Sequence, residues 1–128
     1  MKIKRADVQL AIETVIIVLA YIFVVRPFRV TGPSMLPALA NGQLLLVERV
    51  SYYWRAPRPG EVVVFYVPSR GASLIKRVDY LTDAGVYVLG DNAELSNDSR
   101  NFGVVPRRFV TGRAVLCYWP PRRWGVVR

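Results

Sequence analysis

The chain has 128 residues, which is enough for one domain and a short additional element. Its 18 lysine and arginine residues outnumber 9 acidic residues, and the net charge of +9 suits anionic lipid headgroups or nucleic acid without deciding the fold. The absence of histidine excludes a Ser-His-Asp triad and a His-ligated metal, and the single cysteine, Cys117, excludes an intrachain disulfide. We expect neither a metal nor a cofactor, and we expect Cys117 to be buried in its apolar run.

A basic start at residues 1–7 precedes an apolar run at 8–25, in a chain whose hydrophobic content is 52%. Eighteen helical residues span about 27 Å, close to the ~30 Å hydrocarbon core of a bilayer. A cleaved secretory signal peptide is the alternative, but no small-x-small cleavage pattern follows the run. We predict a cytoplasmic tail at 1–7 and an uncleaved transmembrane signal anchor at 8–25, with Arg26-Pro27 ending the helix. The basic tail favours a cytoplasmic amino end and a translocated body.

From residue 26 onward, short runs of β-branched and aliphatic residues alternate with glycine and proline turn signals, as is typical of strands. No helical period of useful length follows the anchor. The sequence therefore predicts a mainly β protein, in which one N-terminal transmembrane helix precedes a small coiled-sheet or barrel-like all-β domain at 26–128. Strands are expected at 44–47, 62–67, 74–80, 86–89 and 109–119.

Two aromatic clusters interrupt this pattern, one at 51–55 and one formed by Tyr118, Trp119 and Trp124. Such rings often lie at the headgroup level of a membrane, but core or rim packing is an equal alternative. Stacking on nucleic acid is a further possibility, although no recognised nucleic-acid module accompanies the rings. A phospholipid membrane is the expected partner, and no specific nucleic acid is expected.

The stretch Gly32-Pro33-Ser34-Met35-Leu36-Pro37 presents a serine between two prolines. Each proline fixes its own φ and restricts the preceding residue, so Ser34 lies on stiff, non-helical backbone. An ordinary turn is the alternative, because glycine, proline and serine are the usual turn residues. A serine hydroxyl becomes a good nucleophile only when a base takes its proton.

Lys76 is the only lysine beyond the first few residues, and arginine cannot supply a neutral nitrogen base. In a strand, Lys76 shares one face with Leu74 and Val78, and these apolar neighbours would favour its neutral amine. A surface lysine with a buried stem is the commoner alternative. Spacing alone does not show that Ser34 and Lys76 meet.

Several motifs follow one another along the chain from the anchor to about residue 115: Gly32 to Pro37, Gly60 to Phe65, Ile75 to Val78, Gly90 to Asn92, Ser96 to Arg100 and Gly103 to Pro106. In this order they are similar to the motifs of bacterial type I signal peptidases. The resemblance implies a membrane-anchored serine endopeptidase of the cell membrane, with one membrane span and its catalytic domain on the extracytoplasmic face. Its partners would be exported preproteins, from which it removes the N-terminal signal peptide.

Carried over residue by residue, the resemblance implies a Ser-Lys dyad with Ser34 as nucleophile and Lys76 as general base. Ser96 matches the serine that hydrogen-bonds and orients the lysine amine. Asp98 and Arg100 match a supporting ion pair, and Asp91 lies in the same supporting block.

The resemblance also implies an oxyanion hole and small apolar substrate pockets. The Ser34 N–H would be one oxyanion donor. Gly32 stands where some family members carry a hydroxyl, so the second donor is missing or comes from elsewhere. The pockets would accept the Ala-x-Ala end of a signal peptide, and their expected lining residues are Val30, Met35, Val64, Leu74 and Ile75.

The chain departs from the family pattern at 79–85, which replaces the usual Gly-Leu-Pro-Gly-Asp, and at Ala93 and Leu95. It also lacks room for the large inserted second domain of longer members. Three alternatives remain: a catalytically silent membrane-anchored relative, a Ser-Lys protease with one narrow substrate, and a self-cleaving Ser-Lys regulator. The apolar anchor and the missing DNA-binding domain count against the last.

Overall fold

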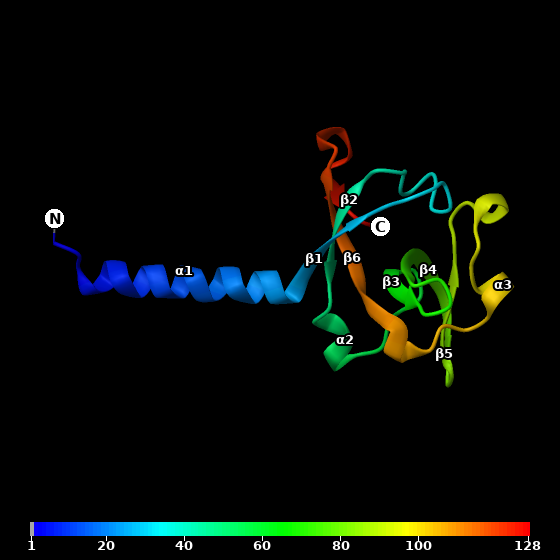
Figure 1. The fold of residues 1–128 in the computed structure, drawn as a ribbon, viewed down its shortest axis with the longest axis horizontal. Coiled ribbons are helices and arrows are strands. Elements are labelled where there is room, and N and C mark those ends of the chain that lie inside the picture. The colour runs from blue at the N-terminus through cyan, green and yellow to red at the C-terminus, as the bar shows by residue number, and fades with distance from the viewer. Residues whose placement is uncertain (1) are drawn as a thin grey trace.

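A single long helix, α1 (Arg5–Val24), stands clear of the rest of the molecule (Figure 1). The computed structural model describes residues 2–128, so the first residue of the predicted tail lies outside the described residues. The helix has 20 residues, a mean hydropathy of 2.0 and no buried residue, and it is long and apolar enough to cross a membrane. It starts before the apolar run because the Asp7 carboxylate accepts a hydrogen bond from the Lys4 N–H at 3.2 Å.

The helix ends at Val24, and the chain continues directly into strand β1 (Val25–Arg29). Arg26 and Pro27, which were expected to end the helix, instead lie inside this strand. Proline is tolerated there because β1 is an edge strand that pairs only with β2.

The body is one antiparallel sheet in the order β1-β2-β6-β3-β4-β5, with β7 added beside β6. The predicted mainly β domain behind one apolar helix is confirmed. Within the described residues, the end strands β1 and β5 do not pair with each other, so the sheet is coiled rather than closed. The remaining strands are β2 (Leu44–Glu48), β3 (Val62–Val67), β4 (Ala72–Thr82), β5 (Gly85–Leu89), β6 (Val110–Trp119) and β7 (Gly125–Val126).

Strand β3 is buried on both faces, which explains its unbroken apolar sequence. Val62 and Val64 point into a cluster that contains Met35, whereas Val63 and Phe65 point into a second cluster on the other face. The continuous run at 62–67 is therefore the centre of two small cores, not a surface strand with one polar face.

Only very short helices occur in the described part of the body. They are α2 (Ser51–Trp54), α3 (Ser99–Phe102) and the 3₁₀ turns Ala93–Leu95, Arg107–Phe109 and Pro121–Arg123. The aromatic cluster at 51–55 forms α2, where a single turn is too short to leave a helical period in the sequence. Its Tyr53 and Trp54 side chains are 73% and 84% exposed, so they are not core residues. Cys117 is buried, as expected.

Candidate active site

Ser34 lies in the loop that connects β1 to β2, on the stiff segment expected from its prolines. The segment is fixed at its start by Gly32, whose N–H donates to Asn41 Oδ1 at 2.9 Å. Gly32 has φ of 80°, which favours glycine. Met35, directly after the serine, is fully buried and anchors the segment in the core, while the Ser34 side chain stays partly exposed.

Lys76 lies in β4 opposite Val63 of β3 and is only 4% exposed. Its strand neighbours Leu74 and Val78 pack in the same apolar cluster as Val63, which agrees with the face predicted from alternation. Burial lowers the pKa of the Lys76 amine below its ordinary 10.5, although the Asp98 carboxylate acts in the opposite direction.

The two side chains meet across 42 residues of sequence: Lys76 Nζ donates to Ser34 Oγ at 2.8 Å. A buried amine whose pKa is lowered, in direct hydrogen-bond contact with a partly exposed hydroxyl, is the geometry by which a base activates a serine.

Asp98 is fully buried beside this pair, and its carboxylate accepts hydrogen bonds from five donor atoms on three residues. Its carboxylate forms an ion pair with Arg100 at 2.7 Å and accepts hydrogen bonds from the Gly90 N–H and the Ser96 hydroxyl. Burial alone would raise the pKa of Asp98, but these bonds outweigh it and hold the pKa well below the usual range.

The Ser96 hydroxyl donates to Asp98 Oδ2 at 2.8 Å, and no hydrogen bond joins it to the Lys76 amine within residues 2–128. Ser96 nevertheless lies close to the nucleophile loop. Gly90 lies against both residues, because a Cβ added to it would overlap Ser96 Oγ and come within 2.6 Å of the Ser34 carbonyl oxygen. An orienting role of Ser96 toward Lys76 stays a prediction.

Asn92, which the sequence interpretation did not single out as a site residue, holds the nucleophile loop at two points. Its backbone N–H donates to the Ser34 carbonyl at 2.8 Å, and its side-chain amide donates to the Pro33 carbonyl at 3.1 Å. Asn41 was also missed. Asn41 directly precedes Gly42 and Asn92 lies two residues after Gly90, both in turn-forming sequence, and turn chemistry alone does not indicate which group an asparagine side chain will bind.

Asp91 does not contact the Ser34–Lys76 pair but forms a bidentate ion pair with Arg77, the residue after the lysine. The two Asp91 oxygens accept from Arg77 Nε at 2.9 Å and Nη2 at 2.8 Å. Because this pair joins β4 to the loop after β5, it supports the backbone on which Lys76 is carried.

Four of the five expected pocket residues belong to one buried cluster, and the fifth, Leu74, packs on the opposite face of the sheet. Val64 lines a hollow of about 370 Å³ together with Phe28 and Ser73. The four residues in the one cluster are Val30, Met35, Val64 and Ile75.

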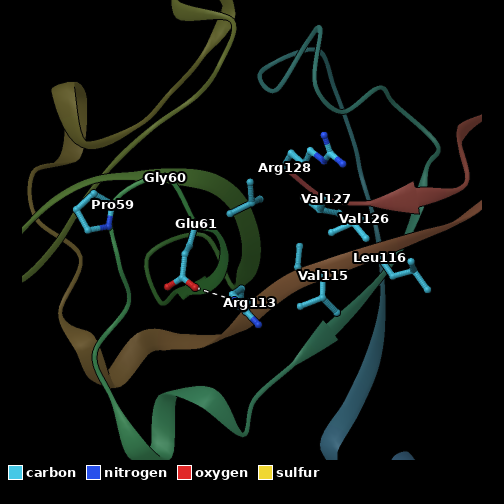
Figure 2. Close-up of a pocket in the computed structure, with 11 residues that line it drawn as sticks. Pro59, Gly60, Glu61, Arg113, Val115, Leu116, Val126, Val127 and Arg128 are labelled. Carbon is cyan, nitrogen blue, oxygen red and sulfur yellow. Dashed lines mark hydrogen bonds and ion pairs between the residues drawn. The ribbon is translucent and has the colours of Figure 1, made fainter.

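A larger hollow, of about 690 Å³, lies elsewhere, between residues 59–62 and strands β6 and β7. Ser34 and Lys76 line neither the hollow of about 370 Å³ nor this larger one. Figure 2 shows Glu61 and Arg113 turned toward each other there, with their side chains 2.9 Å apart. Arg55 also pairs with Glu61, and although burial alone would raise the pKa of Glu61, these partners lower it to about 2. Since these charges are already paired, the hollow offers no reactive group.

Comparison with known proteins gives consistent matches over most of the chain. The family described as signal peptidase, peptidase S26, matches residues 3–81 and 79–119. A probable signal peptidase I-1 of Synechocystis sp. is 29% identical over 91% of this chain and 82% of its own length. A signal peptidase I of Leptolyngbya laminosa is 30% identical over 80% and 73%, respectively. The mitochondrial ATP-independent inner membrane protease subunit 1a of Arabidopsis thaliana is 35% identical over 83% and 77%.

The matches, together with the apolar helix and the small β domain, define a membrane-associated serine endopeptidase. The chain belongs to the signal peptidase family, peptidase S26. Its similar proteins include bacterial, mitochondrial and thylakoidal ones. Family membership therefore does not by itself identify the kind of membrane in which the chain resides.

Proposed function

We propose that this chain removes N-terminal signal peptides from exported preproteins by a Ser-Lys mechanism, with Ser34 as nucleophile and Lys76 as general base. The observation that carries the proposal is the 2.8 Å contact between Lys76 Nζ and Ser34 Oγ, made by an amine that is only 4% exposed. Among the described residues, Lys76 is the only lysine of the β domain, and no histidine competes for the role.

In the proposed mechanism, the neutral Lys76 amine takes the proton of Ser34 as Oγ attacks the scissile carbonyl carbon. The resulting oxyanion accepts a hydrogen bond from the Ser34 N–H, which donates to no other group within residues 2–128. The Lys76 ammonium then protonates the leaving amine and an acyl-enzyme remains. A water molecule, losing its proton to Lys76, hydrolyses that ester and regenerates both side chains.

The Gly32 N–H is already used by Asn41, at 2.9 Å, in the structure without substrate. A second oxyanion donor at this position would require that bond to open. The second donor therefore stays unassigned in the proposed mechanism.

Two free strand edges support an extended peptide as substrate. Strand β1 pairs only with β2, and the first half of β4, at 72–76, pairs only with β3 within the described chain. The hollow of about 370 Å³ lies between them, with Phe28 from β1 and Ser73 from β4 in its lining. A peptide placed there could extend the sheet, and its small side chains would face Val64 and its apolar neighbours. This arrangement suits an Ala-x-Ala cleavage site.

The proposed orientation places the tail at 1–7 in the cytoplasm, the span at 8–25 in the cell membrane and the domain at 26–128 on the extracytoplasmic face. It is supported by the short basic amino end and the apolar helix that follows it. Protease digestion of sealed right-side-out vesicles should then remove the β domain, whereas inverted vesicles should protect it.

The dyad is tested with Ser34→Ala, Lys76→Ala and Lys76→Arg in detergent or liposomes with a preprotein substrate. Each variant should lose cleavage, because the first removes the nucleophile, the second removes the base and the third keeps a permanently charged side chain. Ser69→Ala, at an exposed serine, is the matched control and should cleave normally. Near-normal cleavage by Lys76→Ala would rule out the dyad.

A second measurement separates an active enzyme from a catalytically silent relative. A serine-directed acylating inhibitor such as a penem should label Ser34 covalently, detected as a mass shift on the peptide that contains it. The label should be absent from Ser34→Ala. An unlabelled but folded wild-type chain would favour the silent relative.

A further inference from the structure

Another polar hollow, of about 280 Å³, lies beside the end of α1; it shares Arg49 and Thr111 with the hollow of about 370 Å³, but neither Ser34 nor Lys76 lines it. It is formed by the turn after β2, by α2, by the 3₁₀ turn Arg107–Phe109 and by the start of β6. Its lining residues are Arg49, Tyr52, Tyr53, Arg108, Val110 and Thr111.

The hollow has two arginines and no carboxylate in its lining. Neither Arg49 nor Arg108 forms an ion pair within residues 2–128, unlike Arg55, Arg77, Arg100 and Arg113. The nearest acidic residue in sequence, Glu48, is already bonded to Arg113 and to the Ser51 N–H. Two arginines thus line one small space without an ion-pair partner among residues 2–128.

Donor groups in the hollow suit a phosphate. A guanidinium binds phosphate oxygens through two parallel N–H donors. The Tyr53 hydroxyl can add a third bond, whereas the Tyr52 hydroxyl already donates to Glu61 Oε1 at 3.3 Å. Arg108 is held over the Phe109 ring at 4.7 Å, which limits its freedom, and the Tyr53 side chain is 73% exposed at the rim.

The position of the hollow selects the source of the phosphate. The Arg49 N–H donates to the carbonyl of Val24, the last residue of α1, at 3.2 Å. Figure 1 shows α2 close to the point where α1 meets β1. If α1 spans the bilayer, this end lies where the hydrocarbon gives way to headgroups, and the exposed Tyr53 and Trp54 are the residue types enriched at that depth.

We propose that the Arg49–Arg108 hollow binds the phosphate of an anionic phospholipid headgroup at the foot of the membrane anchor. This inference rests on the membrane orientation of the proposed function but not on the Ser-Lys chemistry. One bound headgroup would hold the β domain at a set height and rotation over the membrane surface, which a single connection at Val24 and Val25 does not do by itself.

The test uses the full chain in uncharged detergent micelles, titrated with phosphatidylglycerol or with phosphatidylcholine, and follows the thermal midpoint. Phosphatidylglycerol should raise the midpoint in a saturable way, and phosphatidylcholine should not. Arg108→Gln should weaken the apparent lipid affinity about fivefold, and Arg49→Gln with Arg108→Gln should weaken it further. Arg107→Gln, in the same 3₁₀ turn but outside the lining, is the matched control and should match the wild type.

Several results would overturn the inference. Equal losses of lipid affinity in Arg107→Gln and Arg108→Gln would indicate an effect of diffuse surface charge. An equal rise of the thermal midpoint with inorganic phosphate would indicate a site for free anions. A higher KM for a soluble peptide in Arg108→Gln, with the lipid response unchanged, would assign the hollow to substrate. The inference holds if Arg108→Gln keeps the wild-type thermal midpoint without lipid and loses only the rise caused by phosphatidylglycerol. This outcome does not depend on whether Ser34→Ala abolishes cleavage.

Discussion

The Lys76 amine combines two properties that are rarely found together in lysine: it is almost fully buried, and its hydrogen-bond partner is a neutral hydroxyl rather than a carboxylate. Asp98 is close enough to affect the charge of Lys76 but is itself saturated by Arg100, Gly90 and Ser96. The carboxylate therefore cannot fully offset the cost of burying an ammonium. This balance makes a neutral base accessible to Ser34.

The lowered pKa of Lys76 predicts the pH dependence of cleavage. Only the neutral amine can accept the serine proton, so kcat/KM should rise with pH and reach half its plateau below 10.5, the ordinary lysine value.

The same pKa shift predicts the pH dependence of stability. Because Lys76 binds its proton more tightly in the unfolded chain, the free energy of unfolding should also rise with pH between the folded-state pKa and 10.5. Peptide cleavage and urea unfolding across pH measure both effects. Lys76→Met should remove this contribution to the stability profile, and an unchanged profile would contradict it.

Asn92 should act by positioning the nucleophile loop rather than by touching the substrate. Asn92→Ala removes the amide donor to the Pro33 carbonyl without adding a charge, so kcat/KM should fall about fivefold to tenfold, the equivalent of ~1 kcal/mol. The midpoint of the pH profile should not move, because Lys76 is unchanged. Asn101→Ala, at an exposed site, is the control. Equal kcat/KM values for the Asn92 variant and the control would show that the loop does not need this bond.

At the scale of elements, β3 and β4 do the most to assemble the site. Strand β3 joins β4 to β6 and divides the two cores, and β4 carries Lys76 on the face of the core that contains Val63 and Val78. The sheet continues beyond Lys76 through residues 77–82, which pair with β5 and bring the loop at 90–100 back to the nucleophile. The departure from the family pattern at 79–85 therefore falls in the outer β4–β5 hairpin and leaves the Ser34–Lys76 contact intact.

Adjacent residues of β3 give a matched test of this role. Phe65 is fully buried, so Phe65→Ala should lower the free energy of unfolding by about 3–5 kcal/mol. Tyr66→Ala, at a side chain that is 42% exposed, should change it by about 0.5 kcal/mol or less. Denaturant unfolding of the detergent-solubilised chain measures both. Similar losses at the two positions would contradict the assignment of Phe65 to the core.

On the scale of the whole molecule, the helix and the β domain are nearly independent. Helix α1 contributes no buried residue, and it contacts the domain mainly through β1. The domain therefore leaves the apolar surface of the helix uncovered, as expected of a helix that lipid covers, and both cores of the domain lie within residues 28–127. Anchoring and catalysis should be separable.

A chain that begins at residue 25 tests this separation. It should stay folded and cleave a soluble peptide at a rate close to that of the full chain, since neither core loses a side chain. In vesicle flotation, high salt should release the shortened chain but not the full one, because electrostatic headgroup contacts are screened and a spanning helix is not. Release of the full chain by salt would show that α1 is not inserted.

The sequence by itself determined the apolar helix, the strand-rich body and the two reactive candidates, because each of these depends on local composition, alternation or the absence of other bases. Only the tertiary structure decided that Ser34 and Lys76 touch, that Asn92 and Asn41 hold the nucleophile loop, and that Ser96 bonds to Asp98. It also showed that Arg26 and Pro27 lie in strand β1 and that the aromatic run forms the helical turn α2. These outcomes depend on strand register and on side chains far apart in the chain, which local patterns do not encode.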